Sequence, residues 1–87
     1  MACFAISYQL NNQQDYPKLW AELDELGGHK VMRSFYFLDV NNTATEVKDH
    51  LISFVDDDDM ISVVPFDERP SCYKCNIGTK AWLDARF

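Results

Sequence analysis

The residues that could support metal chemistry lie near the ends of predicted strands. Gln9 ends the first strand-like stretch with an amide, Asp15 follows the next turn, and Asp39 lies late in another strand-like stretch. Magnesium is bound through carboxylates and water, and it can activate water for hydrolysis. Asp39 and Asp15 are therefore the candidate catalytic residues. A simpler interpretation is favoured for both: Asp15 caps a helix, and Asp39 is solvated beside Asn41 and Asn42.

A run of four aspartates, residues 56–59, is the densest charge in the chain. An EF-hand loop needs ligands at alternating positions, a central glycine and a distal glutamate, and this run has none of them. We interpret it as a solvated loop between a helix and a strand, whose charges also oppose edge aggregation. No metal site is predicted here.

Cys72 and Cys75 form a single C-x-x-C pair. A structural zinc needs about four ligands, and the remaining candidates are Cys3, His29 and His50, which lie far apart in the sequence. A loop thiol pair without a bound metal is the favoured interpretation, and a zinc or redox role is the alternative.

Hydrophobic periodicity predicts the first two elements. Residues 2–10 alternate large apolar with small or polar side chains, which is typical of a strand. A helix then begins near Asp15, with Pro17 in its first turn, and ends at Gly27-Gly28.

The rest of the chain predicts a similar second half. Residues 29–40 favour two short strands, or one strand bent near Arg33 and Ser34. The stretch "TATE", residues 43–46, predicts a capping box for a helix that continues to Val55. Residues 60–66 predict a last strand, and residues 78–87 predict a short helical turn or tail.

This order predicts an α+β, ferredoxin-like βαββαβ two-layer sandwich with a short C-terminal tail, as one domain over residues 1–87. Both helices would cover one face of the sheet. The other face would carry Phe35 and Phe37, so it is too apolar to remain open. A homodimer with sheets face to face would cover it.

Charge and composition limit the partners. The net charge is −6, which has the wrong sign for general phosphate neutralisation on nucleic acid. Neither a secretory signal nor a membrane span is recognisable, so no membrane partner is predicted. Three cysteines are an odd number, which favours a reducing, cytoplasmic setting.

Several stretches resemble a known family in order and spacing. They are "YQLN" and "DY" around the first turn, "RSFYFL" at 33–38, "ATEVKDHLISFVDDDDMISVVPF" at 44–66 and "AWL" at 81–83. Together they are similar to the SinR family, small relatives of the CRISPR-associated Cas-two nucleases. The resemblance implies a ferredoxin-like homodimer. It also implies a magnesium ion at the dimer cleft, held by an aspartate that follows the tyrosine of the first strand.

The position of that aspartate is occupied by Gln9 in this chain. Tyr8, Ser34 and Phe35 match the family's pattern, whereas the metal ligand does not. The residues expected at the dimer cleft or in binding are Tyr8, Gln9, Asn11, Arg33, Ser34 and Phe35.

The favoured function is therefore a non-catalytic, Cas-two-like homodimer that acts by binding a protein or nucleic acid in nucleic-acid defence, without a cofactor. One alternative is a magnesium-dependent endoribonuclease or DNase that uses Asp39 or Asp15. A second alternative is an acidic inhibitor that mimics phosphates towards a nucleic-acid-binding protein.

Overall fold

The computed structural model describes residues 2–13 and 15–87. Within these ranges the chain forms a four-stranded antiparallel sheet and three α-helices, which confirms the predicted α+β class. The elements in chain order are β1 (Ala2–Gln9), α1 (Asp15–Glu25), β2 (His29–Met32), β3 (Phe35–Val40), α2 (Ala44–Leu51), β4 (Met60–Phe66) and α3 (Thr79–Asp84).

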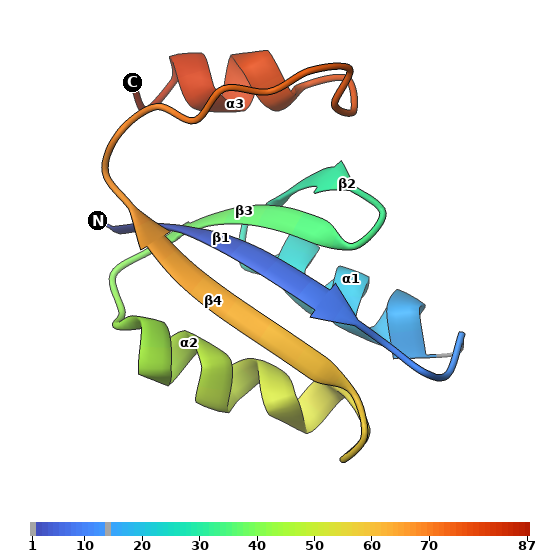
Figure 1. The fold of residues 1–87 in the computed structure, drawn as a ribbon. Helices are drawn as coiled ribbons and strands as arrows, with labels where there is room; N and C mark the ends of the chain where they lie inside the picture. Colours follow the sequence, from blue (N-terminus) through green and yellow to red (C-terminus); the bar gives the residue numbers. More distant parts are fainter. Residues whose placement is uncertain (1, 14) are drawn as a thin grey trace.

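Strand β1 lies inside the sheet, because the strand order is β2-β3-β1-β4 (Figure 1). It pairs with β3 from Ala2↔Val40 to Ser7↔Phe35, and with β4 from Cys3↔Phe66 to Gln9↔Met60. The C-terminal end of β1 therefore lies beside the N-terminal end of β4. The turn that leaves β1 and the aspartate loop that enters β4 meet at this end of the sheet.

Local signals in the sequence explain where the helices begin and end. The side chain of Thr43 accepts a hydrogen bond from the backbone N–H of Glu46, and the Glu46 side chain accepts one from the Thr43 N–H, so the predicted capping box is confirmed. Gly27 ends α1 with a φ of +81°, a left-handed conformation that favours glycine. Helix α2 is shorter than predicted, since residues 52–54 continue as a 3₁₀ turn.

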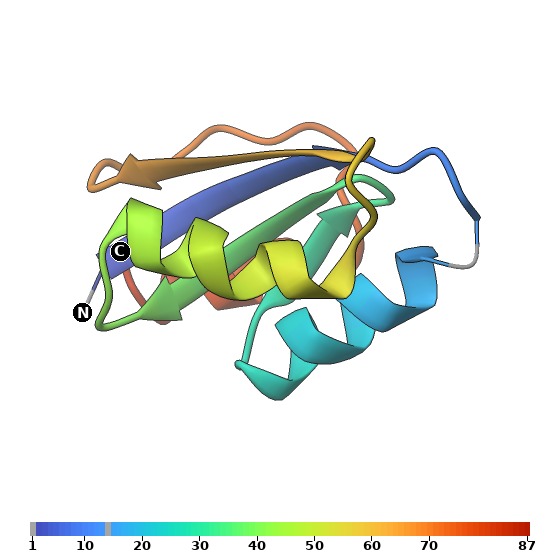
Figure 2. The same ribbon diagram turned by 90° about the horizontal axis from the view of Figure 1, so that it is seen from below.

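One face of the sheet is covered by α1 and α2 (Figure 2). Alternate side chains of β1, among them Phe4 and Ile6, face Leu19 and Leu23 of α1 and Leu51 of α2, and all five are almost fully buried. Burying side chains of this size stabilises the fold by roughly 1.5–3 kcal/mol each. This contact is the main core of the molecule.

The opposite face is partly covered by the chain's own C-terminal segment, and Figure 1 shows α3 across the sheet from α1 and α2. Leu83 of α3 is buried against Val31 and Phe37, and the Trp82 ring lies 5.5 Å from the Phe37 ring. The prediction that a second copy covers the whole of this face is therefore wrong for its β2–β3 half, which α3 covers. The residues predicted as a short helical turn or tail form a helix there, because their apolar side chains have a sheet surface to cover.

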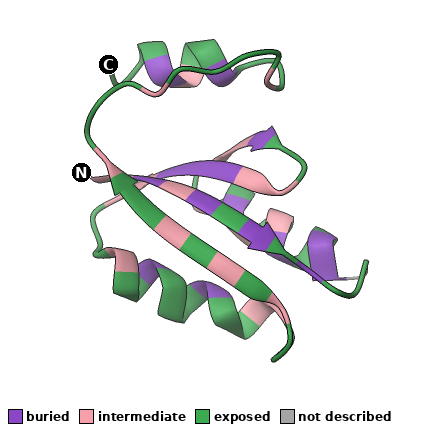
Figure 3. Cartoon of the chain, in the orientation of Figure 1, coloured by how far each residue is buried: buried purple, intermediate pink, exposed green. Residues whose placement is uncertain are grey.

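The β1–β4 half of the same face remains uncovered, and we call its exposed side chains the bare strip. They are Ser7, Gln9, Met60, Ser62 and Val64. Met60 and Val64 are 56% and 51% exposed, and β4 alternates exposed with half-buried positions along its length except for an exposed pair, 64–65 (Figure 3). None of the described helices is long and apolar enough to cross a membrane.

Candidate functional site

Gln9 ends β1 on the bare strip, where it is exposed and pairs with Met60 of β4. Its neighbours on the same face, Ser7 and Ser62, are paired with each other across the two strands. All four side chains are neutral. The position at which the resemblance implies a metal-binding anion is thus an accessible amide among neutral groups.

Tyr8 points to the other side of the sheet and is buried. Its hydroxyl donates a hydrogen bond to the Arg33 carbonyl oxygen at 2.7 Å and accepts one from the Trp20 indole Nε1 at 2.6 Å. Burial raises the pKa of the Tyr8 hydroxyl to about 12. Tyr8 therefore ties β1 to α1 and to the turn after β2, and the sheet separates its side chain from that of Gln9.

The other residues expected at the cleft do not gather around Gln9. Arg33 donates a hydrogen bond to Gln13 at 2.7 Å, and the Ser34 carbonyl accepts one from the Tyr8 backbone N–H at 3.2 Å. Phe35 pairs with Ser7 beside the bare strip, and its ring lies 5.5 Å from that of Phe37. Of the residues expected at the cleft, only Phe35 and Gln9 lie on the face of the sheet that carries the bare strip.

Asp39 cannot replace the missing acid, because it lies at the other end of the sheet. It pairs with Cys3, and Gln9 is six residues further along β1, which corresponds to about 20 Å. The Arg86 Nε lies 2.8 Å from the Asp39 Oδ2, and the Asp39 side chain is only 12% exposed. The predicted solvated position of Asp39 is therefore wrong, since the C-terminal segment folds back over it.

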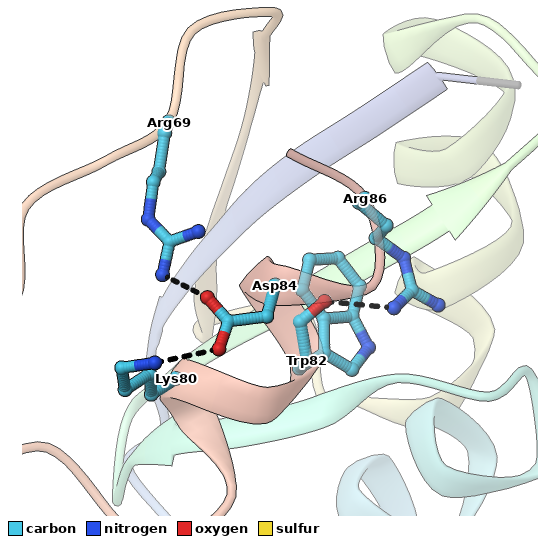
Figure 4. A network of polar contacts seen from close by, with 5 residues as sticks. All are labelled: Arg69, Lys80, Trp82, Asp84 and Arg86. Carbon is cyan, nitrogen blue, oxygen red and sulfur yellow. Dashed lines mark hydrogen bonds and ion pairs between the residues drawn. The ribbon is translucent and has the colours of Figure 1, made fainter.

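Arg86 is itself fixed on α3. Its Nη1 donates a hydrogen bond to the Trp82 carbonyl at 3.0 Å, and its guanidinium lies 3.7 Å from the centre of the Trp82 ring (Figure 4). Asp39 and Arg86 thus hold the C-terminal segment on the sheet, and this contact gives Asp39 a structural role.

Asp15 lies in a group of three carboxylates that the structure brings together. Oxygen atoms of Asp15, Asp56 and Asp59 all lie within 4.8 Å of one another, and we call these residues the acidic cluster. Asp15 is buried, with only 3% of its surface exposed. It is the first residue of α1, so the N-cap position before it lies outside the described residues. Burial raises the pKa of the Asp15 carboxyl, and the neighbouring Asp56 and Asp59 carboxyls raise it further.

Backbone groups fix the loop that supplies two members of the cluster. The Asn11 backbone N–H donates to the Asp59 Oδ1 and the Asp56 N–H donates to the Asp59 Oδ2, both at 2.8 Å. The Asn11 side-chain amide also donates to the Asp58 carbonyl at 2.7 Å. These bonds, above all the one from Asn11, lower the pKa of the Asp59 carboxyl. Asn11 therefore organises the aspartate loop.

The acidic cluster and Gln9 lie near the same end of the sheet. An open groove of about 820 Å³ runs around the start of β4, and Gln9, Met60, Lys48, Asp56 and Asp59 are among the residues that line it. Sequence reasoning considered Asp15 and the aspartates separately and missed their contact. The pairing of β1 with β4 is the signal that predicts it, because it places the turn after β1 beside the loop before β4.

Cys72 and Cys75 lie in the loop between β4 and α3 as free thiols. Burial raises the pKa of the Cys72 thiol, and the adjacent Cys75 raises it further, so neither effect favours a reactive thiolate. Among the described residues no third histidine, cysteine or carboxylate joins them within ligand distance. The structure therefore gives no support to the zinc alternative.

No protein-family model matches the chain.

Proposed function

We propose that the protein is a ferredoxin-like, Cas-two-like binding protein that acts as a homodimer and lacks nuclease catalysis. The element order β-α-β-β-α-β before α3 and the strand order β2-β3-β1-β4 support the ferredoxin-like assignment. The coverage of one sheet face by both α1 and α2 supports it as well. The role in nucleic-acid defence comes from the sequence resemblance alone.

The observation that carries the non-catalytic assignment is that the accessible Gln9 and its neighbours on the bare strip are all neutral. Two copies that met on the bare strip would bring together two amides, with Ser7, Ser62 and Met60 as their neighbours. None of these strip side chains is a carboxylate, the group through which proteins hold magnesium. Without the ion, water is not activated and the charge of the transition state is not neutralised, so phosphodiester cleavage loses most of its rate.

The dimer is supported by the apolar side chains that the bare strip exposes. Met60 and Val64 of β4 are about half exposed, and half-buried Phe35 lies on the same face of the sheet beyond β1. Exposed apolar surface on one continuous face of a small protein marks an interaction site. A second copy offers an identical strip, which satisfies a two-fold contact.

Sedimentation velocity at micromolar concentration tests the dimer. The wild-type protein is expected to sediment as a dimer, and Val64→Asp is expected to sediment as a monomer because it places a charge in the contact. Ile77→Asp is the matched control, since Ile77 is fully exposed and lies outside the strip. A monomeric wild type, or equal dissociation of both variants, would contradict the dimer.

Incubation with magnesium or manganese and with labelled RNA and DNA tests the absence of catalysis. We expect no cleavage by the wild-type protein. Cleavage that survives Gln9→Ala and requires the metal would instead support the alternative described next.

The acidic cluster favours one alternative, a metal-dependent nuclease of the same fold group centred on Asp15. Asp39 is not available for that chemistry, because Arg86 neutralises it and because it lies beside Cys3, about 20 Å along β1 from Gln9. Cleavage by this site would be abolished by Asp59→Asn and retained in Asp39→Asn. The same two variants therefore separate cleavage at the acidic cluster from cleavage at Asp39.

A further inference from the structure

The acidic cluster is electrostatically incomplete in the described part of the chain. Its three carboxylates lie within 4.8 Å of one another, where like charges repel strongly. Among residues 2–13 and 15–87, the only cation that forms an ion pair with Asp15 is Lys18, whose Nζ is 3.8 Å from the Asp15 Oδ1 and whose side chain is 68% exposed. So weak a pair does not balance three adjacent acids.

Asp15 carries the second sign of a missing partner. Its side chain is only 4% exposed, and its Oδ2 is buried without a hydrogen-bond partner among the described residues. Buried polar atoms are normally satisfied, and a buried carboxylate is costly unless it is paired or coordinates a metal. The side chain belongs to the group in which the oxygens of Asp56 and Asp59 converge.

The site is also held in shape by its surroundings. Both oxygens of Asp59 are oriented by backbone N–H groups, those of Asn11 and Asp56. Asn11 further holds the Asp58 carbonyl, which joins the turn after β1 to the loop before β4. These hydrogen bonds orient the Asp59 carboxylate and hold the aspartate loop beside the turn that leads to Asp15.

We propose that Asp15, Asp56 and Asp59 bind one hard divalent cation, calcium or magnesium, which joins the start of α1 to the aspartate loop. All three donors are carboxylate oxygens, the ligand type that these ions prefer, and water completes the coordination. The arrangement is not an EF-hand, because Asp15 comes from a chain segment 41 residues before the loop. The site borders the groove that Gln9 and Met60 of the bare strip also line, but none of its three ligands belongs to the strip, so the proposal does not depend on the dimer.

Calorimetric titration of the chelator-treated, full-length protein with calcium or magnesium chloride measures the binding. One ion per chain is expected, and the cation with the lower dissociation constant identifies the preferred ligand. Asp56→Asn is the main variant, since Asp56 contributes its backbone N–H, and not its side chain, to the hydrogen bonds that close the loop. It is expected to weaken binding about tenfold or more, because affinity follows the number of charged ligands.

Asp58→Asn is the matched control, because it removes the same charge from the same loop but lies outside the cluster. We expect the cation dissociation constant of Asp58→Asn to stay within about twofold of the wild-type value, because the lost charge acts on the ion only through screened, longer-range attraction. Absence of binding to the wild type, or equal weakening by Asp56→Asn and Asp58→Asn, would overturn the proposal. The second result would mean diffuse attraction to an acidic loop.

Thermal unfolding of Asp15→Asn gives an independent result. Without divalent ions this variant is expected to melt above the wild type, because it removes one of three repelling charges from a buried position. In saturating cation the wild type is expected to gain stability and the variant to gain little. If cation leaves the melting temperature of the wild type unchanged, a proton and not a metal satisfies the cluster, and the proposal fails.

Discussion

At the scale of single residues, the two acids and the one amide with candidate chemical roles have different environments. Asp39 is neutralised by Arg86 and holds the C-terminal segment. Asp15 is buried beside two further carboxylates. Gln9, the neutral replacement, is exposed. Arg86 pairs closely with Asp39, whereas the exposed Lys18 pairs only weakly with Asp15, so the acidic cluster has more uncompensated negative charge than Asp39.

Arg86→Met tests the role of Asp39, because it keeps the aliphatic stem over Trp82 and removes the charge. We expect it to lower the free energy of unfolding by about 1–3 kcal/mol, since a mostly buried carboxylate loses its partner. Urea denaturation measures the change. In a protein that already carries Asp39→Ala, we expect Arg86→Met to lower the free energy of unfolding by clearly less than it does in the wild type.

Arg69→Met is the control for the loss of an exposed ion pair. Arg69 contacts Asp84 at 2.7 Å, but Asp84 also binds Lys80 and is about half exposed (Figure 4). The expected cost is about 0–1 kcal/mol. Equal costs for Arg86→Met and Arg69→Met would contradict a structural role for the Asp39–Arg86 pair.

At the scale of elements, α3 changes the character of the sheet. It buries the β2–β3 half of the second face and leaves the bare strip uncovered. The helix has only six residues, too few to be stable alone, so its packing against Phe37 and Val31 must maintain it.

Leu83→Ala is expected to lower the free energy of unfolding by about 2–5 kcal/mol, because it leaves a cavity between α3 and the sheet. Ile77→Ala, at a fully exposed position in the preceding loop, is expected to change it by less than about 0.5 kcal/mol. Chemical denaturation measures both. A small effect of Leu83→Ala would mean that α3 is not part of the cooperative unit.

The attachment of α3 is also expected to depend on pH through His29. The His29 Nε2 lies 2.7 Å from the Thr79 Oγ1 at the start of α3, and burial lowers the pKa of His29 from its ordinary value of 6.5. The unfolded chain therefore takes up the proton first. The contribution of His29 to the stability of the fold is therefore complete above pH 6.5. It is lost as the pH falls from 6.5 to the lower pKa that His29 has in the folded protein.

Melting temperatures at about pH 7.5 and about pH 5.5 measure this dependence. We expect His29→Gln to lose less stability than the wild type between the two values. An equal loss in both proteins would assign the pH dependence to other groups.

The helices and strands follow from local signals, whereas the contacts of the site do not. The capping box at Thr43 and the left-handed Gly27 act within a few residues, so sequence patterns predict them. The Asp39–Arg86 pair joins positions 47 residues apart, and its existence depends on where α3 folds back. The acidic cluster depends in the same way on the pairing of β1 with β4.

At the scale of the whole molecule, charge and exposed apolar surface have opposite effects on self-association. Each copy carries a net charge of −6, so two copies repel one another, while the bare strip favours contact. Salt screens the repulsion and has little effect on apolar burial. An acidic inhibitor bound to a basic partner would respond in the opposite direction, because salt weakens attraction between unlike charges.

We therefore expect the dimer dissociation constant to fall when the salt concentration rises from about 0.05 M to about 0.5 M. Sedimentation equilibrium at the two concentrations measures it. A dimer that weakens with salt would indicate a contact formed by opposite charges, not by the bare strip.

The position of α3 also limits the geometry of any paired assembly. A helix layer and a second sheet both stand about 10 Å above a sheet, so they compete for the same level over β2 and β3. The molecule therefore has three layers over β2 and β3 and only two over β1 and β4. In a dimer, the β1–β4 half of one copy would contact the β1–β4 half of the other, and each α3 would lie beside the edge of the partner's sheet. The contact would be two strands wide, and the two sheets would be displaced sideways relative to one another.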